Sequence, residues 1–244
     1  MSGLAKNFDK AIRKELTAQA AWFPITNTFK IGDYGFFEGG VFRSIGNIKD
    51  KYPDITLESE DGPSSKINFT SDGTKTIKFD AQGNVVNSFA ALGNADASLR
   101  FSFNEANSSV IKANITSSQL KNIEEVAIKL AGKDSWKKKF KVVSSVYKAS
   151  NCVIICSREA GTEFSIGAKA NVLKEIEIGE VSGGFEINSS RDSVFETIGE
   201  SGIIALRLFQ LGWLNGIKLM KERTPSTSNV LIEKEFSEAI EDDF

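Results

Sequence analysis

The sequence contains no histidine. This absence excludes Ser-His-Asp and Cys-His nucleophilic catalysis, zinc sites that need histidine ligands, and the commonest general base of enzymes. The chain also lacks a Walker-type phosphate-binding loop and a GxGxxG dinucleotide fingerprint. A carboxylate-based or lysine-based enzyme stays open on these grounds, but no constellation of residues indicates one. We therefore predict a protein that is not an enzyme and needs no cofactor or metal.

Cysteine is nearly as scarce, since Cys152 and Cys156 are the only two in the sequence. Two thiolates cannot complete a four-thiolate zinc site. Four residues apart on one strand, the two side chains would lie about 13 Å from each other, which is too far for a disulfide. Free thiols agree with a reducing compartment, so we expect an intracellular protein.

Long apolar runs and a strong net charge are also missing. No segment approaches the length of a transmembrane helix, and no signal peptide with a hydrophobic centre is present. The formal net charge of −2 gives no global attraction to nucleic acid, so we predict no nucleic-acid partner. With 41% hydrophobic and 25% charged residues, the chain is typical of a globular protein and not of a disordered one.

Residues 2–20 predict a helix with two different faces. Ser2 can cap it, and the apolar residues recur every four positions on one side: Leu4, Phe8, Ile12 and Leu16. The basic residues fall on roughly the opposite side: Lys6, Lys10, Arg13 and Lys14. The pattern fits a surface helix with a solvated basic side. It fits equally an interfacial helix that meets anionic lipid headgroups, where each basic side chain adds about 1 kcal/mol.

A β-hairpin is predicted at residues 29–48, with Gly39 and Gly40 supplying the positive φ of a tight turn. Phe36 and Phe37 stand next to this turn, where side chains normally face water. Either ring can fold back onto a neighbour. The alternative is a hydrophobic finger that enters a membrane or a partner, flanked by Lys30 and Arg43.

Two Val- and Ile-rich runs, residues 141–149 and 152–158, predict a central antiparallel hairpin with its turn at Ser150 and Asn151. Alternating side chains suit a half-buried hairpin of a soluble fold, and they also suit a ribbon between lipid and water. The basic run that precedes it is either a solvated loop or a headgroup contact: Lys137, Lys138 and Lys139.

Further strands and helices complete the pattern. The strand signals lie at residues 67–70, 76–79, 84–92, 97–104, 110–116, 164–170, 176–187 and 202–210. A helix is predicted at residues 117–132, capped by Ser117 or Ser118 and ended by Gly132, and another at residues 231–240. In residues 97–104 the odd-numbered side chains are apolar and the even-numbered ones polar, which indicates a two-faced strand.

The order of these features resembles the pore-forming domain of the gasdermins. A basic amphipathic helix leads through Phe23-Pro24-Ile25-Thr26 into a hairpin with an aromatic tip. Two amphipathic ribbons, about residues 76–116 and 139–178, then bracket a helix, and the apolar strand at residues 203–211 comes last. In length the chain is most similar to the short fungal gasdermins of the regulator-of-cell-death type, which govern incompatibility between strains.

The resemblance implies an α+β fold, a twisted antiparallel sheet with flanking helices, that refolds into transmembrane β-hairpins of an oligomeric pore. Residues 1–215 would be the pore-forming domain and residues 216–244 a short polar, acidic tail. The implied partners are acidic phospholipids (phosphatidylserine, cardiolipin and phosphoinositides) and further copies of the chain. The implied outcome is a permeabilised plasma membrane and cell death.

The implied functional residues fall into two groups. Those expected to contact lipid are Lys6, Lys10, Arg13, Lys14, Phe36, Phe37, Arg43, Lys137, Lys138 and Lys139. Those expected to form the membrane hairpins are Phe79, Leu99, Phe101, Phe103, Ile111, Ile115, Val143, Tyr147, Val153 and Ile155. Interspersed charged residues would face an aqueous lumen: Lys112, Lys148, Arg158 and Lys169.

Two departures from the family bear on the trigger. Animal members have an inhibitory C-terminal domain released by proteolysis, for which residues 216–244 are too few. Bacterial members carry a lipidated cysteine near their start, and residues 2–8 contain none. The resemblance to the fungal type instead implies activation by a protein from an incompatible allele, which would form a hetero-oligomer with this chain. The protein would be cytoplasmic when inactive and bound to the plasma membrane when active.

Two other readings compete with a pore. One is a non-enzymatic protein-binding module that docks a partner through the Phe36–Phe37 tip and the basic helix. The other is a lipid carrier that encloses its ligand in a β-rich cavity. Loss of a protein complex on removing the tip would favour the first, and a stoichiometric co-purifying lipid would favour the second.

Overall fold

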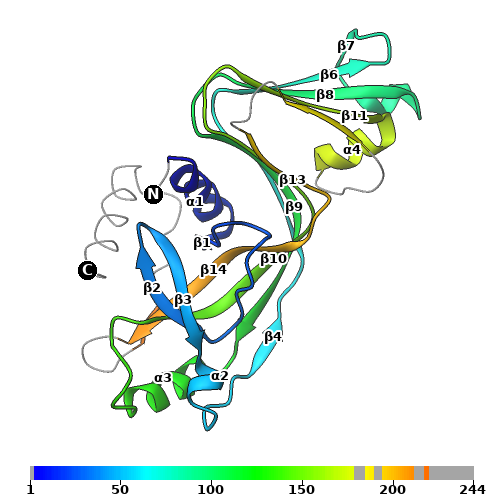
Figure 1. The fold of residues 1–244 in the computed structure, drawn as a ribbon. Coiled ribbons are helices and arrows are strands. Elements are labelled where there is room, and N and C mark those ends of the chain that lie inside the picture. The colour runs from blue at the N-terminus through cyan, green and yellow to red at the C-terminus, as the bar shows by residue number, and fades with distance from the viewer. Residues whose placement is uncertain (1–2, 179–184, 190–193, 212–216, 220–244) are drawn as a thin grey trace.

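The computed structural model describes residues 3–178, 185–189, 194–211 and 217–219. Within them lie four α-helices, α1 (Gly3–Leu16), α2 (Ile48–Lys51), α3 (Ile123–Ala131) and α4 (Ala170–Ile178), and a 3₁₀ helix, η1 (Phe89–Leu92). The remaining regular structure is β-sheet with antiparallel pairing, which confirms the α+β class (Figure 1). No helix in this part of the chain is long and apolar enough to cross a membrane. The helix predicted at residues 231–240 lies outside the described residues.

The larger sheet is built around one long strand, β10 (Lys141–Ser157). Along one edge β10 pairs with β2 (Asp33–Glu38) and then with β9 (Ser108–Leu120). Along the other edge it pairs with β14 (Gly202–Leu211) and then with β13 (Val194–Ile198). The shorter strands of this sheet are β1 (Gln19–Ala20), β3 (Val41–Asn47), β4 (Ser59–Asp61), β5 (Ser65–Thr70) and β15 (Ile217–Leu219).

The strands of the smaller sheet lie next to strands of the larger sheet in the sequence. Its order is β12 (Glu186–Ser189), β11 (Thr162–Lys169), β8 (Asp96–Phe103), β6 (Thr74–Asp80) and β7 (Val85–Val86). The strand β8 lies between β11 and β6, so it is paired along both edges.

Buried side chains cover both faces of β9 and β10. On one face, Phe8 and Ile12 of α1 pack with Ile111 and Ile154. On the other face, Val110 and Ile155 pack with the smaller sheet and α4, in a core that contains Phe101, Phe103, Phe164 and Leu173. Further apolar clusters surround α3 and the β2–β3 hairpin. The part of the larger sheet formed by β9 and β10 is therefore a middle layer between α1 and the smaller sheet.

The central hairpin predicted at residues 141–158 is wrong. Residues 141–157 form the single strand β10, and the chain does not reverse at Ser150 and Asn151. Asn151 has a φ of +48°, and the pairing of β10 with β9 shifts its register between Ser150 and Val153. An extra residue in a left-handed conformation bends a strand as a bulge without ending it.

Two other boundaries are also corrected. Residues 117–120 are strand, because they pair with both β10 and β4, and the helix begins only at Ile123 and ends before Gly132. The strand predicted at residues 176–187 is mostly wrong, since α4 occupies residues 170–178 and β12 begins at Glu186. Ala170, Leu173 and Ile176 recur at helical spacing and are fully buried, which explains the helix. The predicted strand at residues 84–92 contains only the short β7, followed by η1.

Candidate functional site

The two sheets are one antiparallel ribbon folded over on itself. In the larger sheet the neighbours are β5, β9, β10 and β13, and in the smaller sheet they are β6, β8, β11 and β12 in the same order. Each strand of the first set is joined directly in sequence to its counterpart in the second set. Figure 1 shows the strands of the larger sheet rising and turning sharply into β6, β8 and β11. The link between β12 and β13 lies outside the described residues.

The ribbon consists of two hairpins, called hairpin one and hairpin two. Each hairpin has two limbs, and each limb is a pair of consecutive strands, one from each sheet. Hairpin one has the limbs β5–β6 and β8–β9, joined by a tip of residues 81–95 that contains β7 and η1. Hairpin two has the limbs β10–β11 and β12–β13, and its tip contains α4. The strand β7 of the first tip lies at the far end of the smaller sheet, whereas α4 lies under that sheet (Figure 1).

The fold-over depends on the bends at which each limb passes from the larger to the smaller sheet. These bends are called corners, and three of them lie side by side. Gly73, Asn107 and Gly161 each have a positive φ, at +74°, +60° and +74°. Backbone hydrogen bonds join neighbouring corners: the amide of Asn104 donates to the carbonyl of Gly73 at 3.0 Å, and the amide of Gly161 donates to the carbonyl of Phe103 at 2.7 Å. The corners therefore form one continuous line of bending across the limbs.

The smaller sheet has one apolar and one polar face. On the inner face, Leu99, Phe101 and Phe103 of β8 are fully buried with Phe164 and Ile166 of β11. On the outer face, Arg100 lies 3.9 Å from Glu163 and its guanidinium lies 4.9 Å from the centre of the Phe79 ring. Phe79 is thus on the opposite face from Leu99, because Phe79 pairs with Ser98 and Lys78 pairs with Leu99. The alternation predicted for residues 97–103 is confirmed.

The other residues expected in the membrane hairpins divide among three apolar clusters. Val153 and Ile155 face the smaller sheet, whereas Ile111, Ile115 and Tyr147 face α1. Val143 belongs to a third cluster, beside the β2–β3 hairpin.

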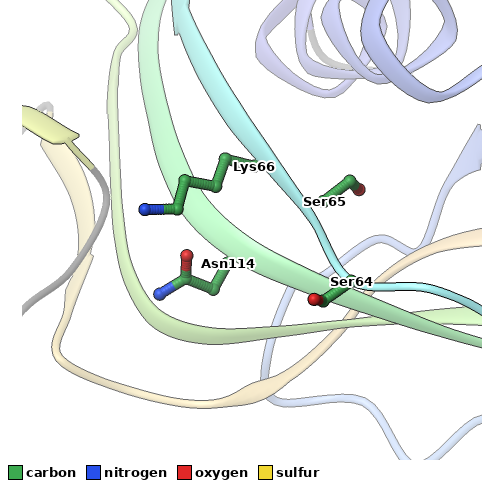
Figure 2. A pocket seen from close by; sticks show the side chains of 4 residues that line it. All are labelled: Ser64, Ser65, Lys66 and Asn114. Atoms are coloured by element: carbon green, nitrogen blue, oxygen red, sulfur yellow. The ribbon is translucent and has the colours of Figure 1, made fainter.

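The face of the larger sheet that packs against the smaller sheet becomes polar where the smaller sheet no longer covers it. Lys66 of β5 pairs with Asn114 of β9, and both line an open pocket together with Ser64 and Ser65 (Figure 2). Asn114 is two residues from Lys112, so their side chains share a face of β9. Lys112 itself is 8% exposed, so the structure does not place it in contact with bulk water.

The helix α1 forms with the predicted face inward. Leu4, Phe8 and Ile12 are buried, Leu16 is partly buried, and Lys14 is exposed with its amine 5.8 Å from the centre of the Phe69 ring. Lys6, Lys10 and Arg13 are half-buried, and Arg13 forms an ion pair with Asp9. The start of α1 reaches a corner of hairpin one, where the side-chain amide of Asn7 donates to the carbonyl of Asn107 at 3.1 Å.

The predicted β2–β3 hairpin is confirmed, with Gly39 and Gly40 at its turn. Phe37 is nevertheless buried against Phe42, at 6.1 Å between ring centres, and Phe36 is half-buried. Arg43 lies 3.2 Å from Glu38. In this conformation the Phe37 ring folds back onto the hairpin, as one of the two sequence readings expected.

The basic run at residues 137–139 precedes β10, and the carbonyl of Lys138 accepts a hydrogen bond from the side-chain amide of Gln210 at 3.0 Å. The run is exposed and leads directly into β10, whose first residue, Lys141, pairs with Gly35. The amine of Lys141 lies 5.6 Å from the centre of the Phe37 ring. Lys141, just after the run Lys137, Lys138 and Lys139, thus contacts Phe37, whereas α1 packs against the middle of β9 and β10.

Sequence reasoning missed two residues that join the hairpins. Lys78 of β6 and Glu177 of α4 form an ion pair at 2.8 Å, and the amine of Lys112 donates to the carbonyl of Glu177 at 2.9 Å. Once residues 176–187 are read as strand, Glu177 cannot be placed at a helix end. The helical spacing of Ala170, Leu173 and Ile176 was the available signal.

Comparisons with known proteins find similarity among solved structures. No protein-family model matches the chain, and no curated protein sequence matches it. Among solved structures, the chain is similar to the cryo-EM structure of the gasdermin A3 membrane pore, at 10% sequence identity, with 92% of this chain and 97% of that chain covered. The TM-score of this match is 0.34.

Proposed function

We propose that this protein forms membrane pores. The folded ribbon straightens at its corners, the two hairpins enter the bilayer, and copies of the chain assemble side by side around an aqueous channel. The protein is stored in the cytoplasm in the folded-over form and acts at the plasma membrane, where permeabilisation kills the cell.

The observation that carries this proposal is the two-faced smaller sheet. An eight-residue strand such as β8 is about 27 Å long, close to the roughly 25 Å apolar band of membrane-spanning strands. Its apolar face is covered by the larger sheet and by α4. Straightening the corners and displacing α4 would expose that face to lipid and leave Arg100, Ser102 and Glu163 facing water. It would also lengthen each limb beyond the 9–11 residues that a spanning strand needs.

Assembly follows from backbone chemistry. In lipid every N–H and C=O must be paired, and an isolated hairpin leaves its outer edges unpaired. In the folded-over form β5 pairs with β9 alone and β13 pairs with β10 alone, among the strands described. The β5–β6 limb of one copy can therefore pair with the β12–β13 limb of the next.

Attachment to the membrane uses the basic residues named above. The helix α1 and the run at residues 137–139 would meet acidic phospholipids such as phosphatidylserine, cardiolipin and phosphoinositides. Anchoring by Phe36 and Phe37 requires Phe37 to leave its contact with Phe42. The trigger would be a protein from an incompatible allele, which joins the assembly as a hetero-oligomer.

Dye release from liposomes tests the proposal. The protein alone, and mixed with an allelic relative, is added to vesicles of phosphatidylcholine with and without phosphatidylserine or cardiolipin. We expect leakage confined to acidic vesicles and to the mixture, with ring-shaped particles in electron micrographs. Ion flux at background under every condition, with no rings, would rule out a pore.

A further inference from the structure

Three charged groups meet where the two hairpins touch in the folded-over form. Lys78 is on β6 of the smaller sheet, Lys112 is on β9 of the larger sheet, and Glu177 is in the last turn of α4. The first two belong to the two limbs of hairpin one, and the third belongs to the tip of hairpin two. Their contacts thus join both sheets and both hairpins at one point.

Glu177 contacts the two lysines through two different groups, its side-chain carboxylate and its backbone carbonyl. Its carboxylate accepts from the amine of Lys78 at 2.8 Å, and its backbone carbonyl accepts from the amine of Lys112 at 2.9 Å. A carbonyl in the last turn of a helix has no intrahelical partner and lies at the negative end of the helix dipole. A buried ammonium is therefore well placed there.

The ammonium group of Lys112 is buried only while the ribbon is folded over, so its contact with Glu177 belongs to that form. Lys112 is 8% exposed, on a strand paired along both edges, and it shares its face with Val110 at the inner core. Removing an ammonium from water costs several kcal/mol, which the contacts with Glu177 offset only while the ribbon stays folded over. The open polar pocket at Asn114, two residues away, lies on the same face, so separating the sheets returns the amine to water.

We infer that Lys112, Lys78 and Glu177 form a latch that sets the threshold for opening the folded-over ribbon, an inference whose role in pore formation rests on the proposed function. Glu177 holds the latch closed. The buried ammonium of Lys112 favours the open form, because it gains hydration when the sheets separate.

The two roles predict opposite effects of two substitutions at the same contact. Glu177→Gln removes the negative charge opposite two ammonium groups and should open the latch. Lys112→Met removes the buried charge without leaving another unpaired, since Glu177 keeps Lys78, and should keep the latch closed. An ordinary packing contact would be weakened by both.

Amide hydrogen exchange of the lipid-free protein is the measurement. Glu177→Gln and Lys78→Met should speed exchange in β8, β11 and α4 by about twofold to fivefold, and leave β2 and β14 unchanged. Lys112→Met should slow exchange in the same three elements by about threefold or more. Lys75→Met, an exposed lysine of the same strand β6, is the matched control and should change nothing.

Dye release from acidic vesicles is measured on the same variants, and we expect leakage to rise and fall in the same order. If Lys112→Met opens the smaller sheet as Glu177→Gln does, or if neither changes exchange, the latch is wrong. If Lys112→Met does not fold, non-additive effects of Lys78→Met and Glu177→Gln support the latch, and additive effects overturn it. A wild-type protein that never permeabilises vesicles would overturn the pore, while the exchange data still decide on the latch.

Discussion

The two hairpins have similar limbs and different tips. Residues 81–95, at the tip of hairpin one, contain no Asp, Glu, Lys or Arg, and this is the longest such run in the sequence. The tip of hairpin two contains α4, with Lys174, Glu175 and Glu177. In the structure Phe89 of the first tip is buried in the same core as Leu173 of α4.

In the proposed pore, this difference would give the hairpins different tasks. An uncharged tip crosses a bilayer at lower free energy than a charged one, because a charged side chain at the bilayer centre costs at least about 2.5 kcal/mol. Hairpin one is thus suited to enter lipid first. Hairpin two covers it until then, through the packing of α4 on Phe89 and through Glu177. Four experiments test this difference between the hairpins.

The largest expected effect concerns the core that both hairpins share. Phe101 of hairpin one and Phe164 of hairpin two are paired directly and are both fully buried. We expect Phe101→Ala and Phe164→Ala each to lower the free energy of unfolding by about 3–5 kcal/mol, measured by denaturant titration. Ser102→Ala, on the outer face, should change it by less than about 0.5 kcal/mol. Strongly unequal losses for the two phenylalanines would show that the hairpins do not depend on one core.

The second experiment adds a charge to each tip. Val85 is 68% exposed, so Val85→Lys should leave the soluble fold intact. Carrying that lysine through the bilayer should cost about 2–4 kcal/mol, which corresponds to a thirtyfold to thousandfold slower dye release. Asn171→Lys, an exposed residue of α4, should slow release much less. Equal slowing by the two variants would refute the different tasks of the tips.

The third experiment compares the corners. Gly161 has a φ of +74° and open space where a Cβ would lie, so Gly161→Ala should lower the free energy of unfolding by about 1–2 kcal/mol through backbone strain alone. Asn107 already tolerates a φ of +60°, and Asn107→Gly should change that free energy by less than about 0.5 kcal/mol. Thermal unfolding of both variants measures the difference. A neutral Gly161→Ala would mean that this corner is not a strained position.

The smallest expected effect concerns ion selectivity. Arg100 of hairpin one and Glu163 of hairpin two share the outer face, which would line the channel. Arg100→Glu should shift the reversal potential in planar bilayers toward cation selectivity, and Glu163→Lys should shift it toward anions. Each unit of changed charge alters the energy of an ion passing at about 4 Å by about 1 kcal/mol in water, and salt screens part of this effect. Shifts in the same direction for both variants would remove these residues from the lumen.

Local features of this fold could be predicted from the sequence. The apolar spacing of Leu4, Phe8 and Ile12 identified α1, the Gly39-Gly40 pair identified the β2–β3 turn, and strict alternation identified β8. Each of these signals depends on residues within a few positions of one another.

The fold-over could not be predicted, because it depends on pairing between distant residues. A corner and a hairpin turn use the same residue types, so residues 104–107 read as an ordinary turn between two paired strands. In the structure β8 and β9 do not pair with each other, and each finds its partners elsewhere. The same ambiguity made Ser150 and Asn151 look like a reversal when they form a bulge. The latch was missed for the same reason, since Lys78, Lys112 and Glu177 are far apart in the chain.

The position of β8 between β6 and β11 has a consequence for how the protein is made. A ribosome completes β6 and β8 long before β11, because β9, α3 and β10 are synthesised in between. During that interval the nascent chain displays a strand edge and a row of aromatic side chains with nothing to cover them, which is the situation in which growing chains aggregate. We therefore expect the yield of folded protein to depend on the rate of elongation through residues 104–161, during which hairpin one waits for its second neighbour.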